Sequence, residues 1–330
     1  MGQSTFKGGA HPYEGKELSM DSPIREMDAK EELVFPMSQH IGAPATPVVA
    51  VGDTVKMGQI IGEASGFISA NIVSSVSGEV KAVEPRLLSS GAKATCVVIA
   101  NDGEYQPVEG LGADRDYTQL TKEEIRQIIK DAGIVGMGGA GFPTNVKVTP
   151  KNEEEIDYVI VNGAECEPYL TSDYRLMLER PEDLIQGLHV VLSLFDNAKG
   201  VIAIEDNKPE AIAKLQYLTD SDPDIEVKVL KTKYPQGAER QVIYVTTGRK
   251  IYSKMLPADA GCVVDNVDTV IAVYEAVILG KPVMDRIVTV TGQGIKNPQN
   301  FDVLSGTDMA ELIEAAGGLT DNVSKVISGG

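Results

Sequence analysis

The chain has 330 residues, of which 42% are hydrophobic and 24% are charged, so it can form cores for two or three domains rather than one. Thirty Lys+Arg stand against 48 Asp+Glu, which gives a formal net charge of -18. This balance argues against nucleic acid and against direct adsorption to anionic lipid, because both need clustered cations. A small phosphate ligand is compatible with it, since backbone N–H groups can hold a phosphate locally.

The three cysteines, Cys96, Cys166 and Cys262, are odd in number and far apart, so they predict no disulfide framework and indicate a reducing compartment. No C-x-x-C pair is present, so we expect neither a zinc site nor an iron–sulfur cluster within these residues. No apolar run reaches the roughly 18 residues of a membrane span. If the protein works at a membrane, we expect partners to hold it there without direct insertion.

The first 110 residues divide into an extended strap and a small β domain. Residues 1–39, including His11, are expected to lie as a strap on a neighbouring domain, because turn signals interrupt them. Residues 40–110 alternate β-branched runs with glycine turns, which is typical of short strands; the candidates are 46–51, 59–63 and 78–83.

This β domain resembles the barrel-sandwich fold of biotinyl and lipoyl carriers in "VGDTVKMGQIIG" followed by "SSVSGEVKAV". In those carriers a lysine at a hairpin tip carries the prosthetic group. Phe67 occupies that place here, and an amide linkage needs an amine. We therefore expect a structural or docking barrel and no carrier function.

Residues 111–283 show an alternation of helix and strand. A helix over 121–132 is predicted from the Thr121 and Glu124 capping box and the stop at Gly133. Beyond it, strands alternate with helices, which predicts a parallel α/β sandwich. The strands are expected at 158–161, 201–204 and 227–230, and the helices at 182–195, 208–218, 237–247 and 266–279.

Residues 284–330 are predicted to form a small β–turn–α–β domain, with a strand at 286–292 and a helix at 307–316. The final Ser328-Gly329-Gly330 is a turn signal. We expect the natural chain to continue beyond it.

The strongest chemical signal is a glycine-rich loop with Gly136, Gly138, Gly139 and Gly141, followed by Lys147. Glycines let the backbone turn sharply and let a ligand lie on uncovered N–H groups, while Lys147 supplies a cation. A plain loop is the alternative, because the spacing fits neither a Rossmann fingerprint nor a Walker loop. The residues alone leave both interpretations open.

An acidic turn, residues 162–168, follows the strand 158–161 and contains Asn162, Glu165 and Glu167. Ligands bind past the carboxyl ends of parallel strands in α/β folds. The two carboxylates are expected to point to the same side of an extended segment. A solvated turn is the alternative; a metal is not predicted, because only Asp173 lies near as a further ligand.

Two helix entries complete the candidate site. Asp265 is the predicted N-cap of helix 266–279, whose N-terminus would also face an anion. Residues 234–241 are either a simple helix entry or a wall of a nucleotide pocket. Cys166, His40 and His189 show no partner at catalytic spacing, so no nucleophile–base pair is predicted.

Six segments in order resemble the family of the C subunit of the Rnf complex and, more distantly, the flavin and NADH module of the complex I 51-kilodalton subunit. They are "TFKGGAHP", "GMGGAGFPTNVK", "VNGAECEPYLTSD", "YPQGAERQ", "DNVDT" and "VTVTGQGIKNP". The resemblance covers 5–330. It implies a complex I 51 kDa-like FMN-binding α/β core with an N-terminal barrel-sandwich domain and a C-terminal β-grasp-like (SLBB) domain.

The resemblance implies an NADH-oxidising, FMN-binding subunit of an ion-translocating NADH:ferredoxin oxidoreductase. Hydride would pass from NADH to FMN, and electrons would then reach two [4Fe-4S] clusters in a C-terminal segment whose cysteines this chain lacks. Other membrane subunits would hold the protein at the cytoplasmic face. A cobalamin reductase of microcompartments and a non-enzymatic docking scaffold are the alternatives.

The resemblance also assigns roles to individual residues. Glu165 and Glu167 are the catalytic candidates, and we hypothesise that one of them repels the anionic nucleotide and keeps its release fast. FMN and NAD(H) binding is implied for Gly136, Gly138, Gly139, Gly141, Phe142, Lys147, Asn162, Glu165, Glu167, Tyr234, Gly237, Glu239, Asn266 and Thr269.

Overall fold

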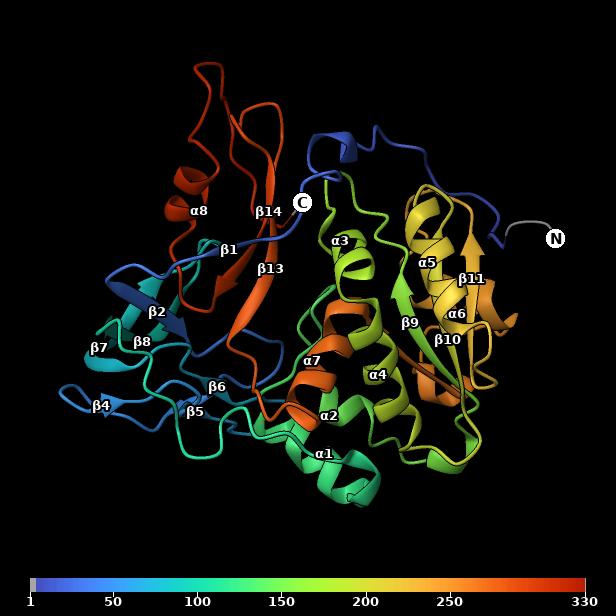
Figure 1. Ribbon diagram of the computed structural model, residues 1–330, viewed down its shortest axis with the longest axis horizontal. Helices are drawn as coiled ribbons and strands as arrows, with labels where there is room; N and C mark the ends of the chain where they lie inside the picture. The colour runs from blue at the N-terminus through green and yellow to red at the C-terminus, as the bar shows by residue number, and fades with distance from the viewer. Residues whose placement is uncertain (1–3, 330) are drawn as a thin grey trace.

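The computed structural model describes residues 4–329 and contains a parallel α/β core, an antiparallel β barrel and a small C-terminal domain (Figure 1). An N-terminal strap passes over all three. The three parts follow one another along the chain, except that strap strands complete two of the sheets.

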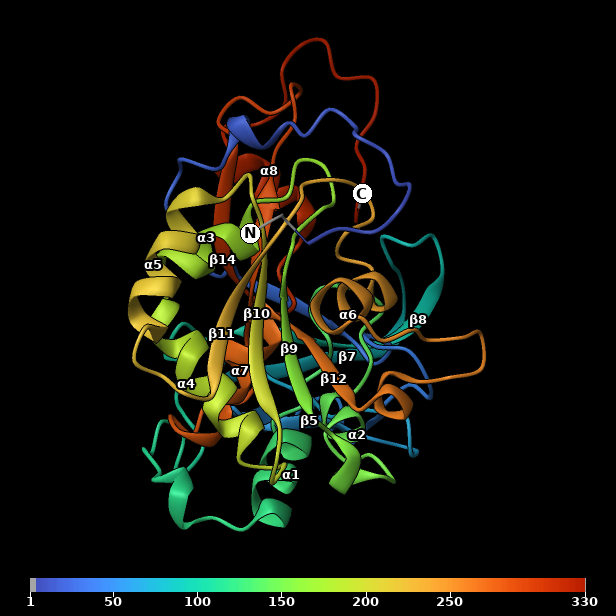
Figure 2. The ribbon, with the colours of Figure 1, turned by 90° about the vertical axis from the view of Figure 1, so that its right-hand side faces the viewer.

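The core sheet has the order β11-β10-β9-β12, and all neighbours are parallel. Helices α3, α4, α5 and α7 cover one face and α6 the other, so both faces are apolar, as the α/β prediction requires (Figure 2). The strands are β9 (Tyr158–Gly163), β10 (Lys199–Glu205), β11 (Ile225–Leu230) and β12 (Cys262–Asn266); the helices are α3 (Ser172–Glu179), α4 (Pro181–Leu192), α5 (Pro209–Thr219), α6 (Glu239–Thr247) and α7 (Val267–Val277).

Short helical elements precede and connect these strands. Helix α1 (Lys122–Asp131) has the predicted capping box, in which Thr121 and Glu124 bond each other's backbone N–H groups. After α1 come the glycine-rich loop and α2 (Thr144–Lys147). The 3-10 turns are η2 (Tyr117–Gln119), η3 (Glu153–Glu155) and η4 (Pro257–Ala260).

The barrel packs two antiparallel sheets around a core that includes Leu33, Phe35 and Ile61. Phe67 lies between β5 and β6 and is 82% exposed, which fits the predicted position at a hairpin tip. One sheet is β2 (Glu32–Pro36), β8 (Lys93–Asn101), β7 (Gly78–Leu87) and β4 (Thr54–Val55); the other is β3 (Thr46–Pro47), β5 (Ile60–Glu63) and β6 (Ile72–Val73).

The C-terminal domain differs from the predicted β–turn–α–β order. Strand β13 (Asp285–Val290) pairs with a second strand, β14 (Gln299–Leu304), before helix α8 (Met309–Ala315). Within residues 4–329 only an isolated bridge, between Ile295 and Leu319, follows α8. Phe301 and Val303 are buried and alternate with more exposed residues, which is the strand pattern that the prediction overlooked. Strand β1 (Arg25–Met27) completes this sheet parallel to β14.

The strap crosses the carboxyl edge of the core sheet before it reaches β1 (Figures 1 and 2). Backbone bridges join Ser4 to Leu230 and Ala10 to Tyr234, and a 3-10 turn, η1 (Lys16–Leu18), follows. The strap therefore lies where the predicted site residues gather.

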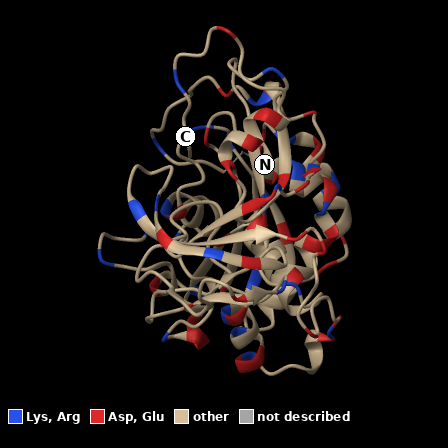
Figure 3. Ribbon diagram, turned by 90° about the vertical axis from the view of Figure 1, so that its left-hand side faces the viewer, with Lys and Arg blue, Asp and Glu red and all other residues tan. Residues whose placement is uncertain are grey.

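Acidic residues are spread over the helices and loops, with lysines and arginines between them (Figure 3). All three cysteines are free. Among residues 4–329, no helix combines the length and the apolar character that a bilayer crossing requires.

Candidate functional site

The glycine-rich loop presents uncovered backbone N–H groups to the outside. Gly136 N–H donates to Phe142 O at 2.8 Å, and Met137 N–H donates to Thr269 Oγ1 at 2.9 Å, so these two are satisfied. Gly138, Gly139 and Ala140 are exposed, and within residues 4–329 their N–H groups have no acceptor. Consecutive free N–H groups of this kind can receive an anion.

The four glycines of this loop have different structural reasons. Only Gly141 has a left-handed backbone, with φ +66°. A Cβ on Gly138 would lie 2.7 Å from Asn266 Nδ2, so glycine permits close packing there. A Cβ on Gly139 would meet nothing within 4 Å. Gly139 therefore leaves the loop open on its outer side.

The loop rests on the N-terminus of α7. Asn266, and not Asp265 as predicted, is the N-cap, since its Oδ1 accepts from Asp268 N at 2.9 Å. Asp265 is the buried penultimate residue of β12, and its Oδ1 lies 3.3 Å from Lys147 Nζ. Asn266 and Thr269 thus hold the loop against the positive end of the helix dipole.

The acidic turn begins at the end of β9, and its two glutamates differ in burial. Glu165 has a left-handed backbone (φ +49°), which turns its side chain inward, while Glu167 stays half-buried. Glu165 Oε1 accepts from Asp173 N at 2.7 Å and from Tyr174 N at 3.4 Å. Glu165 therefore caps α3, a helix that the sequence analysis missed because Thr171 makes no side-chain cap of its own.

Two buried lysines that the sequence analysis missed flank Glu165. Lys16 Nζ, from the strap, lies 3.7 Å from Glu165 Oε2, and Lys208 Nζ donates to Ala164 O at 2.7 Å. Burial raises the pKa of Glu165, and the two ammonium groups oppose that rise. Neither lysine has a local sequence signal, because each comes from a segment remote from the turn.

A second set of contacts ties the turn before α6 to β9. Asn162 Nδ2 donates to Gly237 O at 2.8 Å, and Gly237 N–H donates to Cys166 Sγ at 3.2 Å. Cys166 is half-buried, and partial burial raises the pKa of its thiol. Tyr234, which precedes this turn, is 39% exposed and lies at a cis peptide bond with Pro235.

Lys147 faces the sheet edge below the glycine-rich loop. Its Nζ donates to Val264 O at 2.8 Å as well as to Asp265. Burial raises the pKa of Glu239, and the charge of Lys147 opposes that rise. Phe142, at the end of the loop, is half-buried.

A continuous chain of contacts therefore joins the glycine-rich loop to the acidic turn. Gly138 packs on Asn266, Asn266 Nδ2 donates to Asp173 Oδ2 at 2.6 Å, and Asp173 N–H reaches Glu165. Both segments lie at the carboxyl edge of the same parallel sheet, because Asn162 and Asn266 are partners in neighbouring strands.

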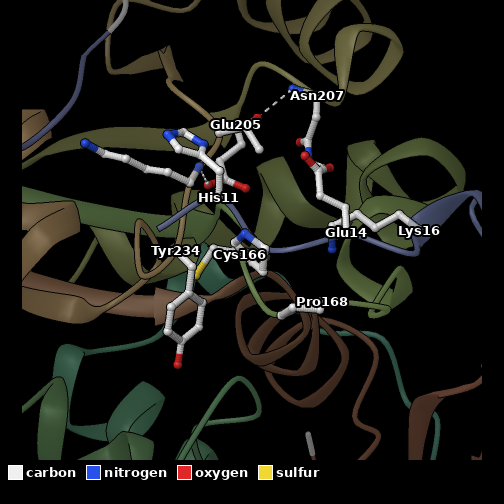
Figure 4. Close-up of a pocket in the computed structure, with 11 residues that line it drawn as sticks. His11, Glu14, Lys16, Cys166, Pro168, Glu205, Asn207 and Tyr234 are labelled. Atoms are coloured by element: carbon white, nitrogen blue, oxygen red, sulfur yellow. Dashed lines mark hydrogen bonds between the residues drawn. The ribbon is translucent and has the colours of Figure 1, made fainter. Parts of the chain in front are cut away.

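The histidine side chains have other partners, although the backbone of His40 lies beside Gly141 of the glycine-rich loop. His40 Nε2 accepts from Ala70 N at 3.1 Å in the barrel, and His189 pairs with Asp222 at 2.9 Å. Among the described residues 4–329, no group of three or more His, Cys, Asp or Glu could hold a metal. A cavity between the strap and the acidic turn is lined by His11, Cys166 and Glu205, among others (Figure 4).

The stability of this edge is expected to depend on the protonation of Glu205. Burial raises its pKa from the ordinary 4.5 to about 7. Between these values the folded protein keeps a proton that the unfolded chain has lost, so this group lowers stability as the pH rises through that window. The difference in free energy of unfolding between Glu205→Gln and the wild type should therefore shift in favour of the variant from pH 5 to pH 8, as measured by urea denaturation.

Glu226→Gln is the matched control, because Glu226 is an exposed glutamate on the adjacent strand β11. It should follow the wild type at both pH values. An identical pH dependence of Glu205→Gln and the wild type would contradict the assignment.

Comparison with known proteins agrees with this architecture. Family models match as an RnfC barrel sandwich hybrid domain over residues 4–104, a Nuo51 FMN-binding domain over 129–275 and an SLBB domain over 287–330. An NAD+-reducing [NiFe]-hydrogenase chain shares the fold with a TM-score of 0.54 at 22% identity, covering 64% of this chain and 41% of that chain.

Two curated relatives are similar over almost the whole chain. The C subunit of a proton-translocating ferredoxin:NAD(+) oxidoreductase complex of Clostridium ljungdahlii is 43% identical over 99% of this chain and 71% of the relative. The Na(+)-translocating counterpart of Acetobacterium woodii is 44% identical over 99% of this chain and 74% of the relative.

The fold and the family models define an α/β module of the Nuo51 FMN-binding type, with a barrel-sandwich domain before it and an SLBB domain after it. The predicted fold class is thereby confirmed. The chain belongs to the RnfC family, the C subunits of ion-translocating ferredoxin:NAD(+) oxidoreductase complexes.

Proposed function

We propose that this chain binds FMN on the glycine-rich loop and accepts hydride from NADH at the acidic turn. The observation that carries the proposal is the set of free N–H groups at Gly138, Gly139 and Ala140 above the N-terminus of α7, within the described residues 4–329. A phosphate-bearing ligand fits these donors, because they and the helix dipole favour a negative charge at the same place.

The residues present fit a flavin nucleotide. Gly139 has open space where a side chain would otherwise stand, so a ligand can approach the backbone. Asn266 and Thr269 fix the loop, Lys147 Nζ donates to Val264 O in β12, and Asn162 Nδ2 ties β9 to Gly237. FMN, when bound, supplies an acceptor for hydride and a donor of single electrons.

The chain's own part in the reaction is to bind and orient the two nucleotides and to exclude water from them. The loop amides hold an anion, and the acidic turn lies at the same sheet edge. The cap that Glu165 makes on α3 fixes the turn there. No general base is needed for hydride transfer, so the proposal gives no proton-transfer role to His40 or His189, whose side chains bond Ala70 N and Asp222. Proximity of the two bound nucleotides is the main contribution expected of the protein.

We assign the proposed repulsion of nucleotide to Glu167. Glu165 is buried and engaged, whereas the carboxylate of Glu167 is half-buried and has no hydrogen-bond partner within residues 4–329. Glu167→Gln removes one negative charge beside an anionic ligand, so NAD+ should bind roughly 3- to 10-fold more tightly at low salt. Competitive inhibition by NAD+ at two ionic strengths measures this.

Glu154→Gln is the control, because Glu154 is an exposed glutamate at η3, which precedes β9, whereas the acidic turn lies at the carboxyl end of that strand. It should leave NAD+ inhibition unchanged. If Glu167→Gln also leaves inhibition unchanged at low salt, the repulsion hypothesis is wrong for this turn.

The direct test of the proposed function is reconstitution. Purified chain should bind FMN in a 1:1 ratio and turn yellow, and anaerobic NADH should bleach the flavin absorbance. A preparation that binds no FMN would contradict the cofactor proposal, and bound FMN that NADH does not reduce would contradict the choice of donor.

In the whole protein we propose that electrons leave for two [4Fe-4S] clusters carried beyond residue 330. The names of the relatives refer to ion-translocating complexes, so other membrane subunits are the proposed partners and the cytoplasmic face the proposed location. Absence of any co-purifying membrane subunit with the full-length protein would contradict this.

A further inference from the structure

The strap residue Lys16 is buried against the backbone of the acidic turn and the residues after it. Its Nζ donates to Leu170 O at 2.6 Å and to Glu167 O at 3.1 Å. The same nitrogen lies 3.7 Å from Glu165 Oε2. All three oxygens belong to one short segment, so one ammonium group donates two hydrogen bonds to its backbone and forms an ion pair with its carboxylate.

The backbone conformation of this segment is unfavourable without contacts from outside it. Glu165 and Tyr169 are left-handed non-glycine residues, with φ of +49° and +69°. Such residues cost free energy and persist where the surroundings over-determine them. The strap makes two further contacts with this segment. Tyr169 N–H donates to Glu14 O at 2.6 Å, and Gly15 packs against the Tyr169 ring.

The strap and the turn enclose a common space. Figure 4 shows Glu14 and Lys16 from the strap on one side of the cavity and Cys166 and Pro168 from the acidic turn on another. The side chain of Lys16 is only 9% exposed, so its charge acts on the turn and not on solvent. Lys208 holds the start of the turn at Ala164 O.

We propose that Lys16 is a positioning residue for the nicotinamide nucleotide: its ammonium group fixes the acidic turn in the shape that receives the substrate. The inference rests on the proposed function, since it assigns the substrate side of the site to this turn. The N-terminal strap thereby becomes part of the site, although it lies outside the α/β core.

Replacing Lys16 should loosen the turn and weaken NADH binding more than it slows the reaction. In Lys16→Met, amide exchange at Tyr169, Asp173 and Tyr174 should be at least tenfold faster in the FMN-free protein, as followed by mass spectrometry. In the FMN-reconstituted protein with ferricyanide as acceptor, KM for NADH should rise about tenfold while kcat stays within threefold.

Three further variants make the test specific. Lys7→Met removes an exposed charge from the same strap and should match the wild type in exchange and in KM. Lys16→Arg keeps the cation and should restore KM to within threefold. Lys16→Gln keeps amide donors without charge, and it replaces Lys16→Met in every comparison if the methionine variant does not fold.

Unchanged amide exchange in Lys16→Met, or in Lys16→Gln where it takes its place, would overturn the claim that Lys16 holds the turn. Faster exchange with unchanged KM would overturn the positioning role. A wild-type protein that binds FMN but is not reduced by NADH would contradict the proposed function instead, and the exchange data would still decide whether Lys16 fixes the turn.

Discussion

Gly139→Val is expected to abolish FMN binding while leaving the fold intact. Gly139 lies at the exposed crest of the glycine-rich loop, its backbone is not left-handed, and a Cβ there meets nothing within 4 Å. Valine therefore fits without strain in the free protein but occupies the space that a ligand needs above the loop amides. We expect FMN affinity to fall at least 100-fold, about 2.7 kcal/mol, in a flavin-fluorescence titration.

Gly66→Val is the matched control for this change. Gly66 is also an exposed loop glycine without a left-handed backbone, and its nearest neighbour to a Cβ is Ala43 at 3.5 Å. It lies in the barrel, so FMN affinity should stay within threefold of the wild type. Full FMN occupancy in Gly139→Val would show that the flavin does not lie on this loop.

The largest stability effect is expected for Lys208→Met. Lys208 has a side chain 2% exposed, and its Nζ donates to Ala164 O and Asn207 Oδ1 and lies 3.8 Å from Glu205 Oε2. Removing the ammonium leaves two buried carboxylates, Glu165 and Glu205, with less compensation. A loss of about 3–5 kcal/mol in the free energy of unfolding is expected at pH 8, measured by urea denaturation.

The double variant Lys208→Met/Glu205→Gln should recover part of that loss, because it removes one of the uncompensated charges. Lys199→Met provides the exposed counterpart: Lys199 pairs with Asp224 at 2.7 Å, but both side chains are more than half exposed. Its cost should stay below about 1 kcal/mol. Equal costs for Lys208→Met and Lys199→Met would contradict the role given to burial.

Elements with local signals could be predicted from the sequence. The capping box of Thr121 and Glu124 fixes the start of α1, and continuous apolar runs such as 201–204 mark strands that are buried on both faces. The positions of the glycine-rich loop and the acidic turn could be predicted because each follows a recognisable helix or strand. Their meeting at one sheet edge follows from the parallel order of β9 and β12.

Features that depend on distant partners could not be predicted. Helix α3 is capped by Glu165 from the preceding turn, a contact that the tertiary fold sets. Strand β1 finds its partner β14 across nearly the whole chain. Lys16 and Lys208 are ordinary lysines in the sequence, and only the tertiary fold makes them buried partners of Glu165 and Glu205.

The measurement that tests the central claim most directly is amide hydrogen exchange with and without FMN. We predict that FMN slows exchange at Gly138, Gly139 and Ala140, whose N–H groups lack protein acceptors in the described chain, and that added NAD+ slows it further at the acidic turn. Protection by FMN that leaves residues 136–141 unchanged and appears elsewhere would contradict this claim.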